Sequence, residues 1–204
     1  MRTGNPNQIR EVVLIRHGRI KTNGSGRYIG YTDHPVMEEG IAALEALRDQ
    51  ALYPEAEAYF TSTLRRTRQT LRILYGQVEF TSMAEFCEYH FGEFESFLHE
   101  ELVRRPEYIA WIEDETGEIS CPGGECRREF EARVAKGWQH LLDQMEARDW
   151  RRICLVCHGG VIGQIMQTLF PGRHNFYEWQ PDNGRGYRLF LQEGRRADYK
   201  TICD

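Results

Sequence analysis

Two histidines in the sequence each follow a short apolar run and each precede a glycine. Residues 12–15 (VVLI) lead into Arg16 and His17, and residues 153–157 (ICLVC) lead into His158. An imidazole can act as a nucleophile or as a ligand, because it titrates near neutral pH. The guanidinium of Arg16 beside it favours an anion as partner. The two strand ends therefore predict an anion site with a histidine inside it.

Two further charged residues lie between these histidines in the sequence. A helix with one buried stripe is predicted from side chains at helical spacing, namely Leu64, Thr67, Leu71 and Leu74. Arg66 falls in its first turn and away from that stripe. A cation there opposes the helix dipole, so Arg66 needs a compensating anion such as a bound phosphate. Glu88 offers a carboxyl group for acid or base chemistry.

Alternating strands and helices position these residues. The run at 12–15 is typical of a strand buried on both faces. Further strands are predicted at 58–61, 153–157, 187–191 and 197–203, the last two forming a hairpin with Gly194 in its turn. Apolar spacing predicts helices over residues 37–51, 64–74, 130–145 and 161–169. The sequence therefore predicts an α/β fold, a three-layer α/β/α sandwich with a mostly parallel central sheet.

Other stretches lack regular periodicity. Residues 19–31 predict a loop over the site, and its glycines would let it fold closely around an anion: Gly24, Gly26 and Gly30. Residues 85–125 form the least regular part of the chain, and an insertion of this length is typical of a cap over an active site. Residues 1–10 predict a loose polar tail. We expect residues 1–204 to form a single domain, since this length buries a substantial core.

The composition excludes several classes of function. A net charge of −5 argues against a protein that binds nucleic acid or a membrane surface. No apolar run approaches the roughly 18 residues that span a bilayer, and the N-terminal residues lack an apolar signal core. We therefore expect a cytoplasmic protein, in which the six cysteines are reduced thiols.

Two cysteine patterns suggest cofactors that we reject. Cys154, Cys157 and His158 match the pattern that attaches c-type haem, but both cysteines lie in an apolar strand and not in an exposed loop. Cys121 and Cys126 flank a Pro-Gly-Gly turn, yet no second pair of ligands accompanies them for zinc. We therefore expect neither a metal nor another cofactor.

Taken in order, the candidate segments resemble the histidine phosphatase superfamily. The resemblance rests on four motifs: Arg16-His17-Gly18 with Asn23 five residues later, Ser-x-Leu-x-Arg-x-x-x-Thr around Arg66, Glu88 before Phe91-Gly92, and His158-Gly159. It implies the fold of the cofactor-dependent phosphoglycerate mutases. Three later segments are similar to the small bacterial phosphatases grouped with α-ribazole phosphatase: residues 111–114, 122–125 and 130–134.

The resemblance implies a metal-independent phosphomonoester hydrolase that acts on a small phosphorylated substrate. A neutral His17 would attack phosphorus and form a phosphohistidine. Glu88 would protonate the leaving alkoxide and then activate water, and a nearby dianionic phosphate favours the protonated carboxyl that this step needs. We also allow for a homodimer.

The remaining site residues implied by the resemblance hold the phosphoryl group. Arg16 and Arg66 supply planar, permanently charged forks that match its oxygens and replace the Mg²⁺ of other phosphoryl-transfer sites. His158, protonated beside the anion, adds a further donor, and Asn23 adds a neutral one. Gly159 completes the set. The other histidines are expected to be structural or exposed: His34, His90, His99, His140 and His174.

The chain also departs from the family pattern. Arg19 and Ile20 stand where the family has an acidic residue followed by Ser or Thr, so one phosphate-side hydroxyl is missing. Residues 89–95 (YHFGEFE) and 159–161 (GGV) differ from the corresponding mutase segments. This difference favours hydrolysis over the mutase-type phosphotransfer that remains an alternative.

Two other classes stay open at this point. The chain could be a catalytically silent phosphate-binding module, although such a module is expected to have lost at least one of the motif residues. Alternatively, His17, His158 and Glu88 could form a site with two histidines and one carboxylate for a metal. Arg16 and Arg66 beside them argue against a cation there.

Overall fold

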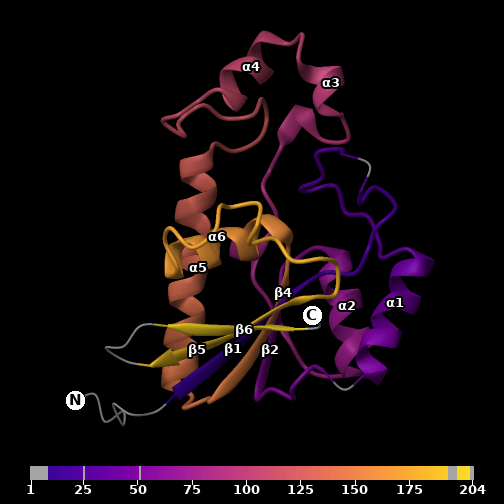
Figure 1. Cartoon of the computed structure of the whole chain (residues 1–204), viewed down its shortest axis with the longest axis vertical. Coiled ribbons are helices and arrows are strands. Elements are labelled where there is room, and N and C mark those ends of the chain that lie inside the picture. Colours follow the sequence, from indigo (N-terminus) through magenta and orange to yellow (C-terminus); the bar gives the residue numbers. More distant parts are fainter. Residues whose placement is uncertain (1–8, 25, 51, 193–196, 203–204) are drawn as a thin grey trace.

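The computed structural model of the protein describes residues 9–24, 26–50, 52–192 and 197–202 (Figure 1). Its sheet has the strand order β3-β2-β4-β1-β5-β6. The strands are β1 (Ile9–Arg16), β2 (Ala58–Thr61), β3 (Thr81–Ser82), β4 (Arg152–Cys157), β5 (Gly186–Gln192) and β6 (Asp198–Ile202). The pairs among β1 to β4 are parallel, whereas β5 runs antiparallel to both of its neighbours. The predicted α/β class and mostly parallel sheet are confirmed.

Helices cover both faces of this sheet. Helices α1 (Glu38–Asp49) and α2 (Arg65–Tyr75) lie on one face, and α5 (Arg127–Ala147) and α6 (Gly159–Leu169) on the other (Figure 1). Successive side chains of β1 therefore enter different cores, as a strand of period two requires. The predicted terminal hairpin forms from β5 and β6. Ile9 and Arg10, predicted to belong to the loose tail at 1–10, instead begin β1, because they pair with β5. The rest of that tail (1–8), Ala51, Gly194 and Cys203 lie outside the described residues.

The strand β1 shows how both cores are built. Val12 and Leu14 pack with the residues of α5 and α6, while Val13 and Ile15 pack with those of α1 and α2. All four side chains are completely buried. An unbroken aliphatic run is therefore what a central strand between two helix layers needs.

The buried face of α2 is wider than its sequence pattern indicates. Thr67, Leu71 and Leu74 are buried as predicted, but Arg66 and Thr70 are buried as well. The expectation that Arg66 lies away from the buried side is wrong, since its side chain is only 1% exposed. The reason is that the first turn of α2 lies beneath the segment 30–32, whose carbonyl groups accept hydrogen bonds from the guanidinium.

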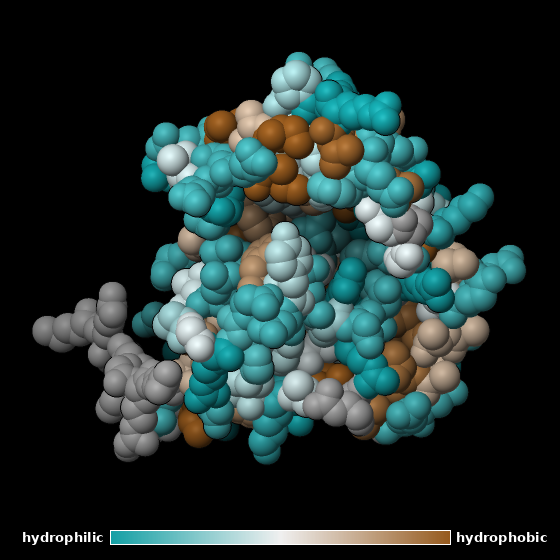
Figure 2. Space-filling model, turned by 45° about the horizontal axis from the view of Figure 1, so that its top comes forward, coloured by the Kyte–Doolittle hydropathy of each residue, from teal (hydrophilic) through white to brown (hydrophobic). Residues whose placement is uncertain are grey.

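Residues 85–125, which we call the cap segment, project beyond the sheet. They contain η2 (Gly92–Phe94), α3 (His99–Leu102) and α4 (Pro106–Ile112), and η1 (Ala84–Phe86) overlaps their start. A small core of their own holds them together, formed by Phe94, Leu102, Tyr108 and Cys121. Figure 1 shows α3 and α4 at the top of the molecule, and Figure 2 shows the surface hollowed beneath them.

The remaining general expectations concern membranes and cysteines. No helix in the described ranges has both the length and the hydrophobicity needed to cross a bilayer. Five cysteines are described, and all five are buried free thiols: Cys87, Cys121, Cys126, Cys154 and Cys157. The two that match the haem pattern are completely buried in β4, where no haem can reach them.

Candidate active site

The two motif histidines meet at the carboxyl edge of the sheet. β1 and β4 are neighbours, and Arg16 pairs in register with Cys157, so both strands end at the same level. His17 and His158 follow directly, and their ring centroids lie 5.2 Å apart. His17 is 4% exposed and His158 is completely buried. Parallel strands thus bring together two residues that are far apart in the sequence.

The backbone fixes the tautomer of His17. Its Nδ1 lies 2.8 Å from the carbonyl oxygen of Gly18. A carbonyl can only accept, so Nδ1 of the neutral ring carries the proton and donates it to this bond. Nε2 is then the nitrogen with a free lone pair. This arrangement is the one that a nucleophilic histidine requires.

A serine holds the second histidine. Nε2 of His158 lies 2.8 Å from Oγ of Ser62, which is also buried. Nδ1 of His158 is buried and has no hydrogen-bond partner among the described residues. A buried polar atom without a partner costs free energy, which a bound ligand can recover.

Both motif arginines donate to backbone carbonyl groups through their Nη atoms. Nη1 of Arg16 donates to the carbonyl of Pro181 at 2.7 Å. Arg66 donates from Nη2 to Gly30 at 2.7 Å and from Nη1 to Thr32 at 3.0 Å. The Nε atoms of both arginines are buried without a partner in the described part of the chain. Nδ1 of His158 also lacks a partner there, so three buried polar atoms of the motif residues are unsatisfied, and the two guanidinium groups among them favour an anion as ligand.

Glu88, in the cap segment, contacts the first turn of α6, which directly follows His158. Its Oε2 accepts from the backbone N–H of Gly160 at 2.9 Å, and its Oε1 accepts from that of Tyr89 at 3.0 Å. Gly160 lies in the first turn of α6, where the helix dipole favours a negative charge. A Cβ atom on Gly160 would lie 2.4 Å from Oε1 of Glu88, so only glycine allows this approach.

The electrostatics keep both histidines neutral in the free protein. Burial lowers the pKa of His17 and of His158 well below the ordinary 6.5, and the positive charge of Arg66 lowers both further. A neutral His17 agrees with the expected nucleophile. The protonated His158 expected from the resemblance requires the charge of a bound anion, because the unliganded site disfavours the imidazolium.

These lowered pKa values predict a pH-dependent stability. Below about pH 6.5 the histidines bind protons in the unfolded chain but stay neutral in the folded protein. The free energy of unfolding therefore decreases as the pH is lowered below about 6.5. We expect a slope of up to about 1.4 kcal/mol per pH unit for each histidine. Urea unfolding at pH 5, 6 and 7 measures it. His158→Asn should flatten the slope, whereas a slope unchanged by both His158→Asn and His17→Asn would contradict the prediction.

The other two predicted site residues occupy different positions. Gly159 begins α6, and a Cβ atom there would lie 3.2 Å from Cζ of Arg16, so its lack of a side chain makes room for the guanidinium. Asn23 instead closes a turn with Ile20, because its Oδ1 accepts from the Ile20 N–H at 2.9 Å. Its role in substrate binding stays a prediction.

Several supporting residues were missed by the sequence analysis. Ser62 belongs to the motif around Arg66, yet nothing in that motif names His158 as its partner. Nδ2 of Asn183 donates to the carbonyl of His17 at 2.8 Å from a loop without periodicity. Arg133 donates to the carbonyls of Cys87 and Glu88, which ties the start of the cap segment to α5.

The metal alternative gains no support from this geometry. Among the described residues, no group of three histidine, cysteine, aspartate or glutamate side chains is arranged to hold a metal ion. His17, His158 and Glu88 instead share their surroundings with two guanidinium groups, whose charge lowers the pKa of both rings. The residues fit an anion better than a cation.

Comparison with known proteins decides the family. The model of the histidine phosphatase superfamily (branch 1) matches residues 12–199. The chain belongs to the histidine phosphatase superfamily. This histidine phosphatase is 28% identical over 161 residues to an adenosylcobalamin/α-ribazole phosphatase of Salmonella typhimurium, covering 76% of this chain and 77% of that one. It is 27% identical over 196 residues to phosphoserine phosphatase 1 of Hydrogenobacter thermophilus, covering 93% and 90%.

Solved structures agree on the fold of this histidine phosphatase. The α-ribazole phosphatase of Shigella flexneri superposes with a TM-score of 0.81 over 95% of this chain and 96% of that chain, at 23% identity. The expected resemblance and the three-layer fold are both confirmed. The family and its phosphatase relatives also confirm the expected class of enzyme, a phosphoric monoester hydrolase.

Proposed function

We propose that this histidine phosphatase hydrolyses a small phosphorylated metabolite through a phosphohistidine on Nε2 of His17. The observation that carries the proposal is the set of three buried polar atoms without partners, Nε of Arg16, Nε of Arg66 and Nδ1 of His158, beside a histidine whose free lone pair is on Nε2. A phosphoryl group satisfies all three atoms at once and exposes its phosphorus to that lone pair.

The reaction proceeds in two displacements. The Nε2 lone pair of His17 forms a bond to phosphorus as the P–O bond of the ester breaks, and the leaving oxygen takes the proton of the Glu88 carboxyl. The Glu88 carboxylate then takes a proton from water, whose oxygen displaces His17 and yields inorganic phosphate. Arg16 and Arg66 neutralise the charge on the phosphoryl oxygens in both steps, which is the part a metal ion plays elsewhere.

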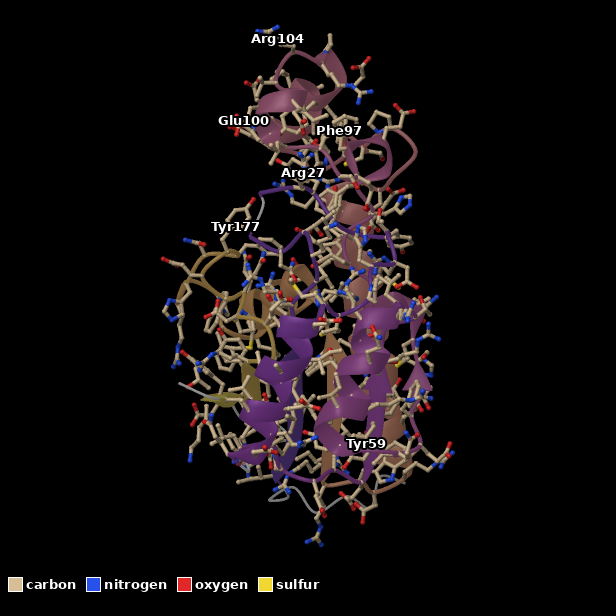
Figure 3. The ribbon with its side chains drawn as sticks, turned by 90° about the vertical axis from the view of Figure 1, so that its right-hand side faces the viewer. Arg27, Tyr59, Phe97, Glu100, Arg104 and Tyr177 are labelled. Carbon is tan, nitrogen blue, oxygen red and sulfur yellow. The ribbon has the colours of Figure 1, made fainter. Side chains whose placement is uncertain are left out.

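The leaving group would lie in the hollow between the cap segment and the carboxyl edge of the sheet (Figure 2). Tyr177, which is 78% exposed, lies in the loop before β5 and points toward Arg27 and Phe97 (Figure 3).

We propose that residues 85–125 act as the cap of a single domain formed by residues 1–204. α-Ribazole phosphate is the first substrate to test, supported by the name of the Salmonella relative, and phosphoserine is the second.

The proposed setting is the cytoplasm, which the five buried free thiols support. The proposed partner is a small phosphorylated substrate, with no nucleic acid and no membrane, as the negative net charge supports. A homodimer remains the proposed assembly, to be measured by light scattering.

Phosphate release tests the proposal directly. p-Nitrophenyl phosphate, α-ribazole phosphate, phosphoserine and 3-phosphoglycerate are supplied in EDTA, and inorganic phosphate is measured. Release that persists in the chelator supports the proposal. Conversion of 3-phosphoglycerate to its isomer without phosphate release would instead indicate a mutase, and binding of phosphate without any turnover would indicate a silent module.

Removing the acid of Glu88 should depend on the leaving group. Glu88→Gln is expected to lower kcat/KM, which reports the first displacement alone, about 100-fold for an alkyl ester such as glycerol phosphate, but less than about tenfold for p-nitrophenyl phosphate, whose phenolate needs no proton. Parallel assays of both substrates measure the ratio. The exposed Glu93→Gln, also in the cap segment, should leave both rates unchanged. Equal losses on the two substrates would argue against a general acid at Glu88.

A further inference from the structure

A cap carboxylate holds the segment that lies over Arg66. Glu95 follows η2 in the cap segment, and its carboxylate accepts four hydrogen bonds from residues 30–32. Oε1 accepts from the backbone N–H groups of Gly30 at 2.9 Å and Tyr31 at 2.7 Å. Oε2 accepts from the N–H of Thr32 at 3.2 Å and from its Oγ1 at 2.6 Å. All four donors are neutral, and together they fill the acceptor positions of a carboxylate.

The carbonyl groups of the same segment hold Arg66. The carbonyls of Gly30 and Thr32 accept from Nη2 and Nη1 of Arg66. The N–H groups of residues 30–32 therefore donate to Glu95, while the carbonyl groups of Gly30 and Thr32 accept from Arg66. Two bonds to one edge of a planar guanidinium fix its orientation, and so they determine where the unpartnered Nε points.

The packing around this segment permits little adjustment. A Cβ atom on Gly30 would lie 1.8 Å from the carbonyl oxygen of Tyr89 and 2.7 Å from Oε1 of Glu95. Backbone bonds also join the two stretches, because Ser96 donates to Tyr28 at 2.8 Å and Tyr28 donates to Phe97 at 3.0 Å. Within 30–32, the three backbone N–H groups donate to Glu95, while the Thr32 carbonyl also accepts from the N–H of His34 at 3.0 Å. Glu95 is therefore the partner that the donor side of these peptide groups depends on.

We propose that Glu95 is a positioning residue that sets the orientation of Arg66 and so couples the cap segment to the binding of the phosphoryl group. The inference rests on the proposed function, since it assigns Arg66 to that group. Glu95 itself touches neither substrate nor His17. Its effect should therefore appear in phosphate affinity and in turnover together, and only as long as Arg66 is present to transmit it.

Glu95→Gln is the sharpest variant, because it keeps the size of the side chain but turns two acceptor positions into N–H donors that face other donors. We expect kcat/KM for p-nitrophenyl phosphate to fall between about 10- and 100-fold, the loss typical of a catalytic group displaced by less than about 1 Å. The dissociation constant of inorganic phosphate, measured by titration calorimetry, should rise about tenfold. Glu93→Gln, two residues away and paired only with Arg105 at 3.2 Å among the described contacts, is the matched control.

A double-mutant cycle separates positioning from a general loss of structure. In an Arg66→Lys background, Glu95→Gln should have almost no further effect on phosphate affinity, because the orientation that it disturbs no longer exists. Equal effects of Glu95→Gln with and without Arg66 would overturn the proposal, as would a single variant with unchanged phosphate affinity. If Glu95→Gln fails to fold, Thr32→Val removes one of the four donors and keeps the carbonyl. It should weaken phosphate binding about threefold, and unchanged affinity would again overturn the proposal.

The phosphate titration also keeps this inference distinct from the proposed function. A wild-type protein that binds phosphate but hydrolyses no ester would refute the hydrolase while leaving the coupling of Glu95 to Arg66 measurable. Active wild-type enzyme with an additive cycle would refute only the role of Glu95.

Discussion

Replacing His17 with alanine is expected to lower kcat for every phosphomonoester by about 10⁴-fold or more, as the loss of a covalent nucleophile does in other enzymes. Alanine removes the Nε2 lone pair that would form the bond to phosphorus. The measurement is phosphate release from p-nitrophenyl phosphate in EDTA. His140→Ala, an exposed histidine on α5, is the control and should keep full activity.

Binding separates this chemical loss from a structural one. His17→Ala keeps both arginines and His158, so it should still bind inorganic phosphate within about tenfold of the native affinity. Quenched samples of the native protein should contain phosphohistidine at His17 during turnover, and those of the variant should not. Activity that survives in His17→Ala would refute the central assignment.

Arg66→Lys is expected to lower kcat/KM about 1,000-fold, although it preserves the positive charge. A single ammonium cannot donate to the carbonyls of Gly30 and Thr32 and also present a second planar edge to phosphoryl oxygens. Loss of an arginine that stabilises a phosphoryl transition state typically costs between about 10³- and 10⁵-fold. Steady-state kinetics on p-nitrophenyl phosphate measure the loss.

The control for this variant lies on the same helix. Arg68→Lys makes the identical change at an exposed position of α2, two residues further along, and should leave kcat/KM unchanged. Arg66→Lys with activity similar to that of Arg68→Lys would mean that the buried guanidinium serves the fold and not the reaction.

The sequence predicted the sheet and the convergence of its motifs because both follow from local patterns. An unbroken aliphatic run requires burial on two faces, and polar residues after parallel strands meet at one edge. His17 and His158 could therefore be placed together without a structure. Arg66 was correctly assigned to the first turn of its helix, but its burial depends on a loop that folds over that turn, which helical spacing does not report.

The supporting contacts could not be predicted for a different reason. Glu95 and Glu88 both bind backbone N–H groups from distant parts of the chain. Every residue except proline carries such a donor, so the sequence contains no signal that pairs the carboxylate with its partner. Gly160 gives a partial signal, because only a glycine tolerates the approach of Glu88. The sequence shows the glycine, but it does not show that Glu88 is the side chain that packs against it.

The double burial of β1 also limits how this protein can evolve. Exchange of one aliphatic residue for another within 12–15 preserves both cores, so substitutions there should be tolerated. Deletion of a single residue would move every side chain that precedes it to the opposite face, or shift His17 by about 3.3 Å along the strand. We therefore expect lineages of this enzyme to vary freely in the identity of these residues but never in their number.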